Sequence, residues 1–174
     1  GTLSTLLRKL VQAGLITPAD PGTTPFLADR PLRVFAITSA GRERFFELMM
    51  DTISHPGAYR RLFHIKALHL AFLPLEQQLF LVEHYLAHCR QIMRSKQTDM
   101  QDVSDNPIKQ EHMHPALREA ASALIQLKQK QWQLELAWGQ ALREHLLARL
   151  KHHEKEEYRD GSLSNPAQSA TDSI

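Results

Sequence analysis

The sequence predicts a mainly α-helical protein that carries a small β-wing. Three observations predict this class: several segments place apolar residues at steps of three and four, two short apolar segments flank a proline-rich stretch, and the last helical segment keeps a heptad pattern. The chain has 174 residues, of which 43% are hydrophobic. That composition is sufficient to bury a core.

Charge and cysteine content limit the possible functions. The formal net charge is only +2, from 21 basic and 19 acidic residues, so attraction to nucleic acid has to come from a local basic patch. The single cysteine, Cys89, excludes an internal disulfide, and no apolar run approaches the roughly 20 residues that cross a bilayer. We therefore expect a cytoplasmic protein without a membrane segment.

The first segment, residues 2–14, is predicted to form a short amphipathic helix. Thr2 or Ser4 is a plausible N-cap, and Gly14 is suited to a left-handed stop. Five apolar residues recur at helical spacing and are expected to turn inward: Leu3, Leu6, Leu7, Leu10 and Val11. The chain opens at Gly1 without an initiator Met, so we expect that its extreme N-terminus is missing.

A β-ribbon with a long loop is predicted next. Residues 17–31 are rich in proline and form the loop, while residues 15–17 and 32–38 flank it as strands. Thr38 or Ser39 can cap a following helix that ends near Ser54. The turn-forming His55-Pro56-Gly57 then ends a first domain of residues 1–54.

Residues 56–158 are predicted to form a helical domain. Residues 59–73 and 75–97 favour two helices separated at Pro74. Residues 97–114 are polar and are interpreted as a linker, and the final helix begins near Pro115. The tail, residues 159–174, is rich in small polar residues and is predicted to be disordered.

The final helix carries a heptad stripe, most of it apolar, at alternating steps of three and four, which is typical of a helix that packs on a partner. The stripe consists of Leu117, Ala120, Leu124, Leu127, Gln131, Leu134, Trp138, Ala141, His145 and Ala148. A homodimer held by these helices is one interpretation. The other is that the helix packs only on residues 59–73 of its own chain.

Two stretches resemble the PadR family of winged-helix regulators. Residues 1–16, with Leu7-Arg8-Lys9-Leu10 and Gly14-Leu15-Ile16, are similar to the family's recognition helix and its exit into the wing. Residues 33–42, ending in Thr38-Ser39-Ala40-Gly41-Arg42, are similar to the second wing strand and the start of the next helix. Residues 63–90 and 131–147 resemble the helical dimerisation domain of the longer members, so the resemblance covers about residues 1–155.

This resemblance implies a truncated winged helix-turn-helix, lacking the two helices before residue 1, followed by an α-helical dimerisation domain with a long C-terminal helix. It implies a bacterial, sequence-specific DNA-binding regulator, a repressor, that acts as a homodimer on operator DNA. The residues expected at DNA are Thr2, Ser4, Thr5, Arg8, Lys9, Arg30 and Arg33. Those expected at the dimer contact are Leu117, Leu124, Leu127, Leu134 and Trp138.

Two alternatives remain open. Trp132 and Trp138 can line a pocket for a small aromatic effector, or they can serve packing alone. The chain as a whole can be a DNA-binding regulator, or a helical interaction module that dimerises without binding DNA.

The sequence gives no reason to expect an enzyme, a metal site or a cofactor. His84 and His88 are spaced one helical turn apart beside Cys89, but the metalloprotease glutamate is absent after His84, so a chance pair is the favoured interpretation. Cys89 lies on an apolar helix and is expected to be a small buried hydrophobe. No glycine-rich phosphate loop or catalytic triad is recognisable.

Overall fold

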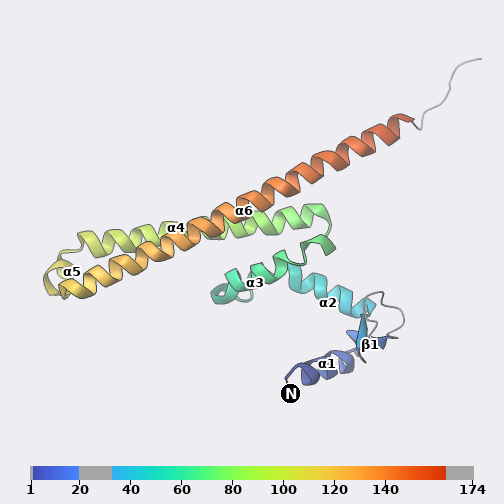
Figure 1. Ribbon diagram of the computed structural model, residues 1–174, viewed down its shortest axis with the longest axis horizontal. Coiled ribbons are helices and arrows are strands. Elements are labelled where there is room, and N and C mark those ends of the chain that lie inside the picture. Colours follow the sequence, from blue (N-terminus) through green and yellow to red (C-terminus); the bar gives the residue numbers. More distant parts are fainter. Residues whose placement is uncertain (1, 20–32, 164–174) are drawn as a thin grey trace, which may run out of the picture. The chain divides into compact units, whose positions relative to one another are not determined.

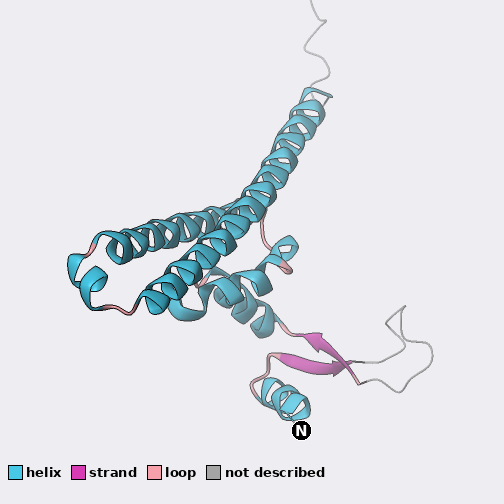
Figure 2. Cartoon of the chain, turned by 60° about the vertical axis from the view of Figure 1, so that its left-hand side comes forward, coloured by secondary structure: helices cyan, strands magenta, loops and turns pink. Residues whose placement is uncertain are grey.

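The computed structural model describes the backbone of residues 2–19 and 33–163, and the side chains in these ranges except those of residues 110 and 153–163. It is mainly helical, with one two-stranded antiparallel sheet (Figures 1 and 2). The chain divides into two compact units, Gly1–Tyr59 and Arg60–Ile174. The division falls a few residues after the turn at His55-Pro56-Gly57.

The first unit begins with helix α1, Thr2–Gln12. Gly14 ends it with a positive φ of 69°, which glycine adopts without steric cost. The Gly14 amide donates to the Val11 carbonyl and the Leu15 amide to the Leu10 carbonyl, a pair of bonds that closes the helix end. The predicted left-handed stop is confirmed.

The predicted β-ribbon is confirmed as an antiparallel hairpin, but the loop prediction is wrong for residues 17–19, which pair with the second strand despite Pro18. Strand β1, Ile16–Ala19, pairs with strand β2, Val34–Ile37, with Ile16 opposite Ile37 and Ala19 opposite Val34. The loop between them, and with it Arg30, lies outside the described residues.

Helix α2, Ser39–Met50, begins at Thr38, whose hydroxyl accepts a hydrogen bond from the Gly41 amide at 3.0 Å. The prediction that this helix ends near Ser54 is wrong. It ends at Met50, because the carboxylate of the C-cap residue Asp51 accepts from the Ile53 and Ser54 amides and turns the backbone out of the helix.

The apolar side of α1 is less covered than expected. Leu7, Leu10 and Val11 are partly buried, but Leu3 is 68% and Leu6 54% exposed. The prediction that all five apolar residues turn inward is therefore wrong for Leu3 and Leu6, because no described element packs over the first turns of α1.

After the 3₁₀ helix η2, Pro56–Ala58, the second unit is built from long helices. The single helix predicted for residues 59–73 is divided into helix α3, Tyr59–Ala67, and the 3₁₀ helix η3, Leu70–Phe72, before the predicted break at Pro74. Helix α4, Leu75–Asp105, then starts with Pro74 as its N-cap residue. The buried side-chain amide of Gln78 donates from Nε2 to the Leu73 carbonyl at 2.7 Å and stabilises the turn between η3 and α4.

The predicted linker at residues 97–114 is instead helical. Helix α4 continues to Asp105, and helix α5, Pro107–His112, follows at once. The Asn106 side chain accepts from the Ile108 and Lys109 amides, and Pro107 occupies the first helical position, where a missing N–H has no cost. The turn-forming tripeptide therefore marks the start of a helix.

Helix α6, Pro115–Leu163, is the long C-terminal helix and packs along α4. Its predicted start near Pro115 is confirmed. The predicted disorder is wrong for residues 159–163, which continue the helix, and residues 164–174 lie outside the described part.

The core of the second unit lies between α3, α4 and α6. Its largest fully buried side chains include Phe63 of α3 and Tyr85 of α4, whose rings stack with centroids 3.9 Å apart. Leu146 of α6 is 3% exposed. Gly139 lets α4 approach α6 closely, since a Cβ there would lie 2.8 Å from Leu86 Cδ2.

Candidate nucleic-acid interface

Helix α1 exposes a continuous polar face. Helical spacing places its hydroxyl and basic residues opposite the leucines, and all of them are exposed to solvent. These residues are Thr2, Ser4, Thr5, Arg8 and Lys9. The structure thus brings together, on one accessible face, five of the seven residues predicted to meet DNA.

Thr38 fixes the end of α1 against the start of α2. Its hydroxyl donates to the Gly14 carbonyl at 2.6 Å, and its amide donates to the Leu15 carbonyl at 3.1 Å. Gly41 follows one turn later, where a Cβ would lie 2.0 Å from the Leu15 carbonyl oxygen. The Thr-x-x-Gly motif therefore has a steric and hydrogen-bonding function: it closes the hairpin onto both helices.

Three basic residues of this unit are exposed outside any ion pair of the described residues, whereas Arg44 is paired with Glu47 at 2.8 Å. Arg33 is exposed immediately before β2, while Arg30 lies outside the described residues. Within the described part of the chain, Arg8, Lys9 and Arg33 enter no ion pair. Cations without an acidic neighbour keep their full attraction for phosphate.

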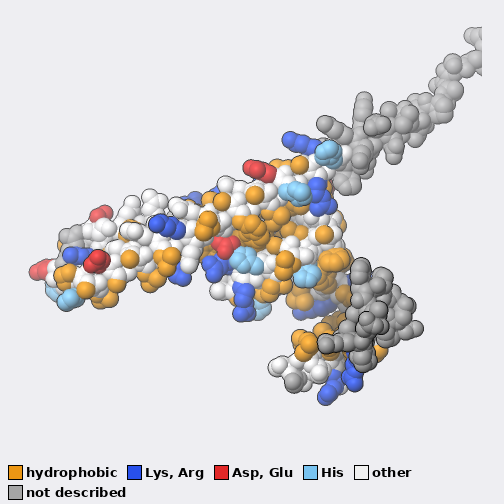
Figure 3. Space-filling model, viewed as in Figure 1, with side chains coloured by type: hydrophobic (Ala, Val, Ile, Leu, Met, Phe, Trp, Pro, Cys, Tyr) orange, Lys and Arg blue, Asp and Glu red, His pale blue; other side chains and the backbone are white. Residues whose placement is uncertain are grey.

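In the second unit, the predicted dimer residues form an exposed apolar stripe on α6. Leu117 is 59%, Leu124 55%, Leu127 51%, Leu134 72% and Trp138 40% exposed. Apolar side chains are visible along the face of the helix pair in Figure 3. We call these five residues the α6 stripe.

Packing inside the chain uses another face of α6. Glu135, Gly139 and Leu146 lie toward α4, and Trp138 meets the Phe63 ring of α3 edge-on at 5.8 Å. The interpretation that α6 packs only on residues 59–73 is wrong, since α4 is its main neighbour. The four leucines of the α6 stripe stay largely uncovered by the described residues, whereas Trp138 is partly covered by α3 and α4.

Glu135 joins the three helices at a polar junction. Its Oε2 accepts hydrogen bonds from Tyr85 Oη at 2.7 Å and His64 Nε2 at 2.8 Å, and Arg60 Nε lies 4.0 Å from Oε1. Burial raises the pKa of Glu135, but the hydrogen bonds from His64 and Tyr85 outweigh it and hold the pKa below its usual value. Burial, then the bond to Glu135, raises the pKa of Tyr85.

The two tryptophans are engaged on different neighbours. Trp132 packs on His88 at 5.6 Å and lies under the Arg60 guanidinium at 5.7 Å. Trp138 lines a shallow depression of about 370 Å³ with His64, Leu134 and Glu135. Trp132 is not part of this lining, so the depression does not combine the two rings.

His84, His88 and Cys89 lie close together along α4. No group of three or more potential ligands occurs among the described residues. Burial raises the pKa of Cys89 to about 11, and its side chain is fully buried. The prediction of a buried, hydrophobic cysteine is confirmed.

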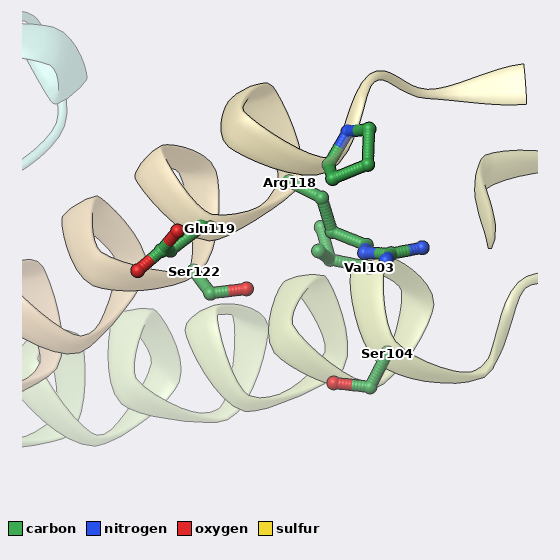
Figure 4. Close-up of a pocket in the computed structure, with 6 residues that line it drawn as sticks. Val103, Ser104, Arg118, Glu119 and Ser122 are labelled. Carbon is green, nitrogen blue, oxygen red and sulfur yellow. The ribbon is translucent and has the colours of Figure 1, made fainter.

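Three further hollows lie between α4 and α6. One, of about 560 Å³, is formed where α4 ends and α6 begins, with Val103 and Ser104 facing Arg118, Glu119 and Ser122 across it (Figure 4). Two others, of about 430 and 600 Å³, adjoin at Arg90. The sequence predicted neither these hollows nor the junction at Glu135. The position of Glu135 between Leu134 and Leu136 was the feature that could have indicated the junction.

The sequence matches no protein-family model and no curated protein. Among the described helices, none combines the length and apolar character needed to cross a membrane.

Proposed function

We propose that the chain is a sequence-specific DNA-binding transcription regulator of the PadR type, with α1 as its recognition helix and the hairpin as its wing. The observation that carries this proposal is the exposed polar face of α1, fixed to the hairpin and α2 through Thr38. Recognition helices meet bases with short polar side chains and phosphates with basic ones. Thr5, Arg8 and Lys9 supply both kinds.

A homodimer is part of the proposal. Operators are commonly two-fold symmetric, and a repressor needs two copies of its DNA-binding unit. The exposed α6 stripe supports this, because burying a large apolar side chain contributes about 1.5 to 3 kcal/mol. A small aromatic effector remains a prediction from the family resemblance.

DNA binding by the whole chain tests the proposal. Fluorescence anisotropy with a labelled random-sequence duplex, over a series of salt concentrations, gives the affinity and its salt slope. Arg8→Ala with Lys9→Ala should weaken binding and reduce the slope of log K against log salt by about two, one for each lost phosphate contact.

A matched control removes two positive charges elsewhere. Arg61→Ala with Lys151→Ala changes exposed residues of α3 and α6 and should leave the slope as in the wild type. Absence of salt-sensitive binding by the wild type would contradict the proposal and favour a helical dimerisation module without DNA binding.

A further inference from the structure

We propose that the groove between α4 and α6 binds a small organic oxyanion, a carboxylate or phosphate carried on an apolar body. Helical spacing places the lining residues Gln129 and Leu136 on the side of α6 away from Leu127 and Leu134 of the α6 stripe, with Gln133 on the flank between. The groove is therefore separate from the proposed dimer contact. It also does not depend on DNA binding.

The smaller cavity in this groove combines the volume of a small-molecule site with a mostly polar lining. Its volume, about 430 Å³, is within the usual range for such sites. Met93 and Leu136 are its apolar residues. Its polar residues are Arg90, Arg94, Gln97, Gln129 and Gln133. Carboxamides donate and accept hydrogen bonds, so the cavity can orient a ligand around an apolar contact.

Positive charge is concentrated in this cavity. Arg90 and Arg94 are one turn apart on α4 and share a face. No acidic residue belongs to the lining, and within the described part of the chain neither arginine enters an ion pair. Two guanidinium groups in this arrangement match the oxygens of a carboxylate or phosphate.

The adjoining cavity shows a contrasting charge pattern. It also contains Arg143, but the Arg143 guanidinium is paired with Glu83 at 2.8 Å, and Glu144 lies in the same lining. Acidic side chains there balance the cations. An anion would therefore be held at Arg90 and Arg94, and the body of the ligand would lie over Met93 and Leu136.

Calorimetric titration of the full chain with three matched probes tests this site. Naphthoate and naphthyl phosphate carry the anion on the same apolar body, and naphthamide lacks the charge. We expect saturable binding of an anionic probe, with naphthamide weaker by about tenfold or more. The tighter of the two anions identifies the ligand as a carboxylate or a phosphate.

Variants locate the binding. Arg90→Gln with Arg94→Gln should lower the affinity for the anionic probe by about tenfold or more, whereas Arg61→Gln with Lys151→Gln should leave it unchanged. In side-chain NMR spectra, the amides of Gln97, Gln129 and Gln133 should shift on titration. Both arginines are exposed, so folded variants are expected.

Several results would overturn the proposal. One is the absence of saturable binding for both anionic probes. Another is an affinity for naphthamide equal to that for the anionic probes. The third is an equal loss of affinity in the control variant Arg61→Gln with Lys151→Gln. Weaker DNA binding on removal of Arg90 and Arg94, without any binding of the anionic probes, would show that these arginines meet phosphates of nucleic acid instead.

Discussion

Two residues, Thr38 and Gly41, hold α1, the hairpin and α2 of the first unit together. The Thr38 side chain both donates to the Gly14 carbonyl and accepts from the Gly41 amide, so one hydroxyl closes α1 and opens α2. Gly41 keeps the backbone close to the Leu15 carbonyl. The position of α1 relative to the hairpin thus depends on a contact that a larger side chain would break.

Replacing Gly41 tests this contact. Gly41→Ala puts a Cβ 2.0 Å from the Leu15 carbonyl oxygen, so we expect a loss of about 1 to 3 kcal/mol in the free energy of unfolding of this unit. Gly57→Ala is the control, since a Cβ there meets nothing within 4 Å. Chemical denaturation followed by the Thr38 amide resonance measures both, and equal stability of the two variants would contradict the account.

Glu135 gives the second unit a pH dependence. Its pKa is held below the usual 4.5, so the ionised form favours the folded state. That stabilisation is fully present above pH 4.5 and is lost as the pH falls through the lower folded-state pKa. The groups that face this carboxylate are His64, Tyr85 and Arg60.

Glu135→Gln should therefore lower the free energy of unfolding by about 1 to 3 kcal/mol at neutral pH, and the difference from the wild type should shrink in acid. Urea unfolding at about pH 7 and about pH 3.5 measures the difference. The exposed Glu119→Gln is the control. A difference that stays constant over this range would exclude Glu135 as the source of the pH dependence.

At this scale, local chemistry could be predicted and distant contacts could not. Gly14 and Thr38 act on the backbone within a few residues, so their capping functions follow from residue type and position. Glu135 lies 71 residues from His64 and 50 from Tyr85 along the chain. No periodicity in a single sequence pairs residues so far apart.

Among the elements, α6 is distinctive because it has two apolar faces. One packs on α4 through Gly139 and Leu146, and the α6 stripe lies on another. The heptad pattern indicated the stripe but could not show which neighbour covers the helix. On the hidden face, Glu135 and Gly139 are residues that period-based analysis treats as interruptions, and Leu146 lies outside the predicted heptad positions.

Truncating leucine side chains of the α6 stripe to alanine tests its function. Leu124→Ala, Leu127→Ala and Leu134→Ala together should convert a dimer to a monomer in sedimentation velocity with little effect on the fold, because these side chains are exposed in the single chain. Leu146→Ala should instead cost about 2 to 5 kcal/mol in stability, since Leu146 is buried. An unchanged sedimentation coefficient in the triple variant would contradict the dimer contact.

The region from Gln97 to His114 shows where element prediction fails. Its polar composition indicated a linker, yet Asn106 and Pro107 form a helix start, and Lys109 pairs with Asp102 to join α5 to α4. Helices that expose most of their surface carry little apolar periodicity. Capping residues were the stronger signal here.

For the whole molecule, the two units suggest a division of tasks. The exposed polar face of α1 belongs to the first unit, and the α6 stripe and the arginine-lined groove belong to the second. We expect the second unit to bring two copies together and the first to contact DNA. The mainly helical class and the hairpin followed from the sequence, whereas the groove depends on how α4 and α6 pack.

Selection of duplexes from a random library by the full chain tests the central claim most directly. If α1 recognises DNA in a symmetric dimer, the enriched sequences should form an inverted repeat with half-sites about one helical turn, roughly 34 Å, apart. Arg8→Ala with Lys9→Ala should abolish the enrichment. Recovery of unrelated sequences by the wild type, or the same inverted repeat from the variant, would contradict recognition by α1.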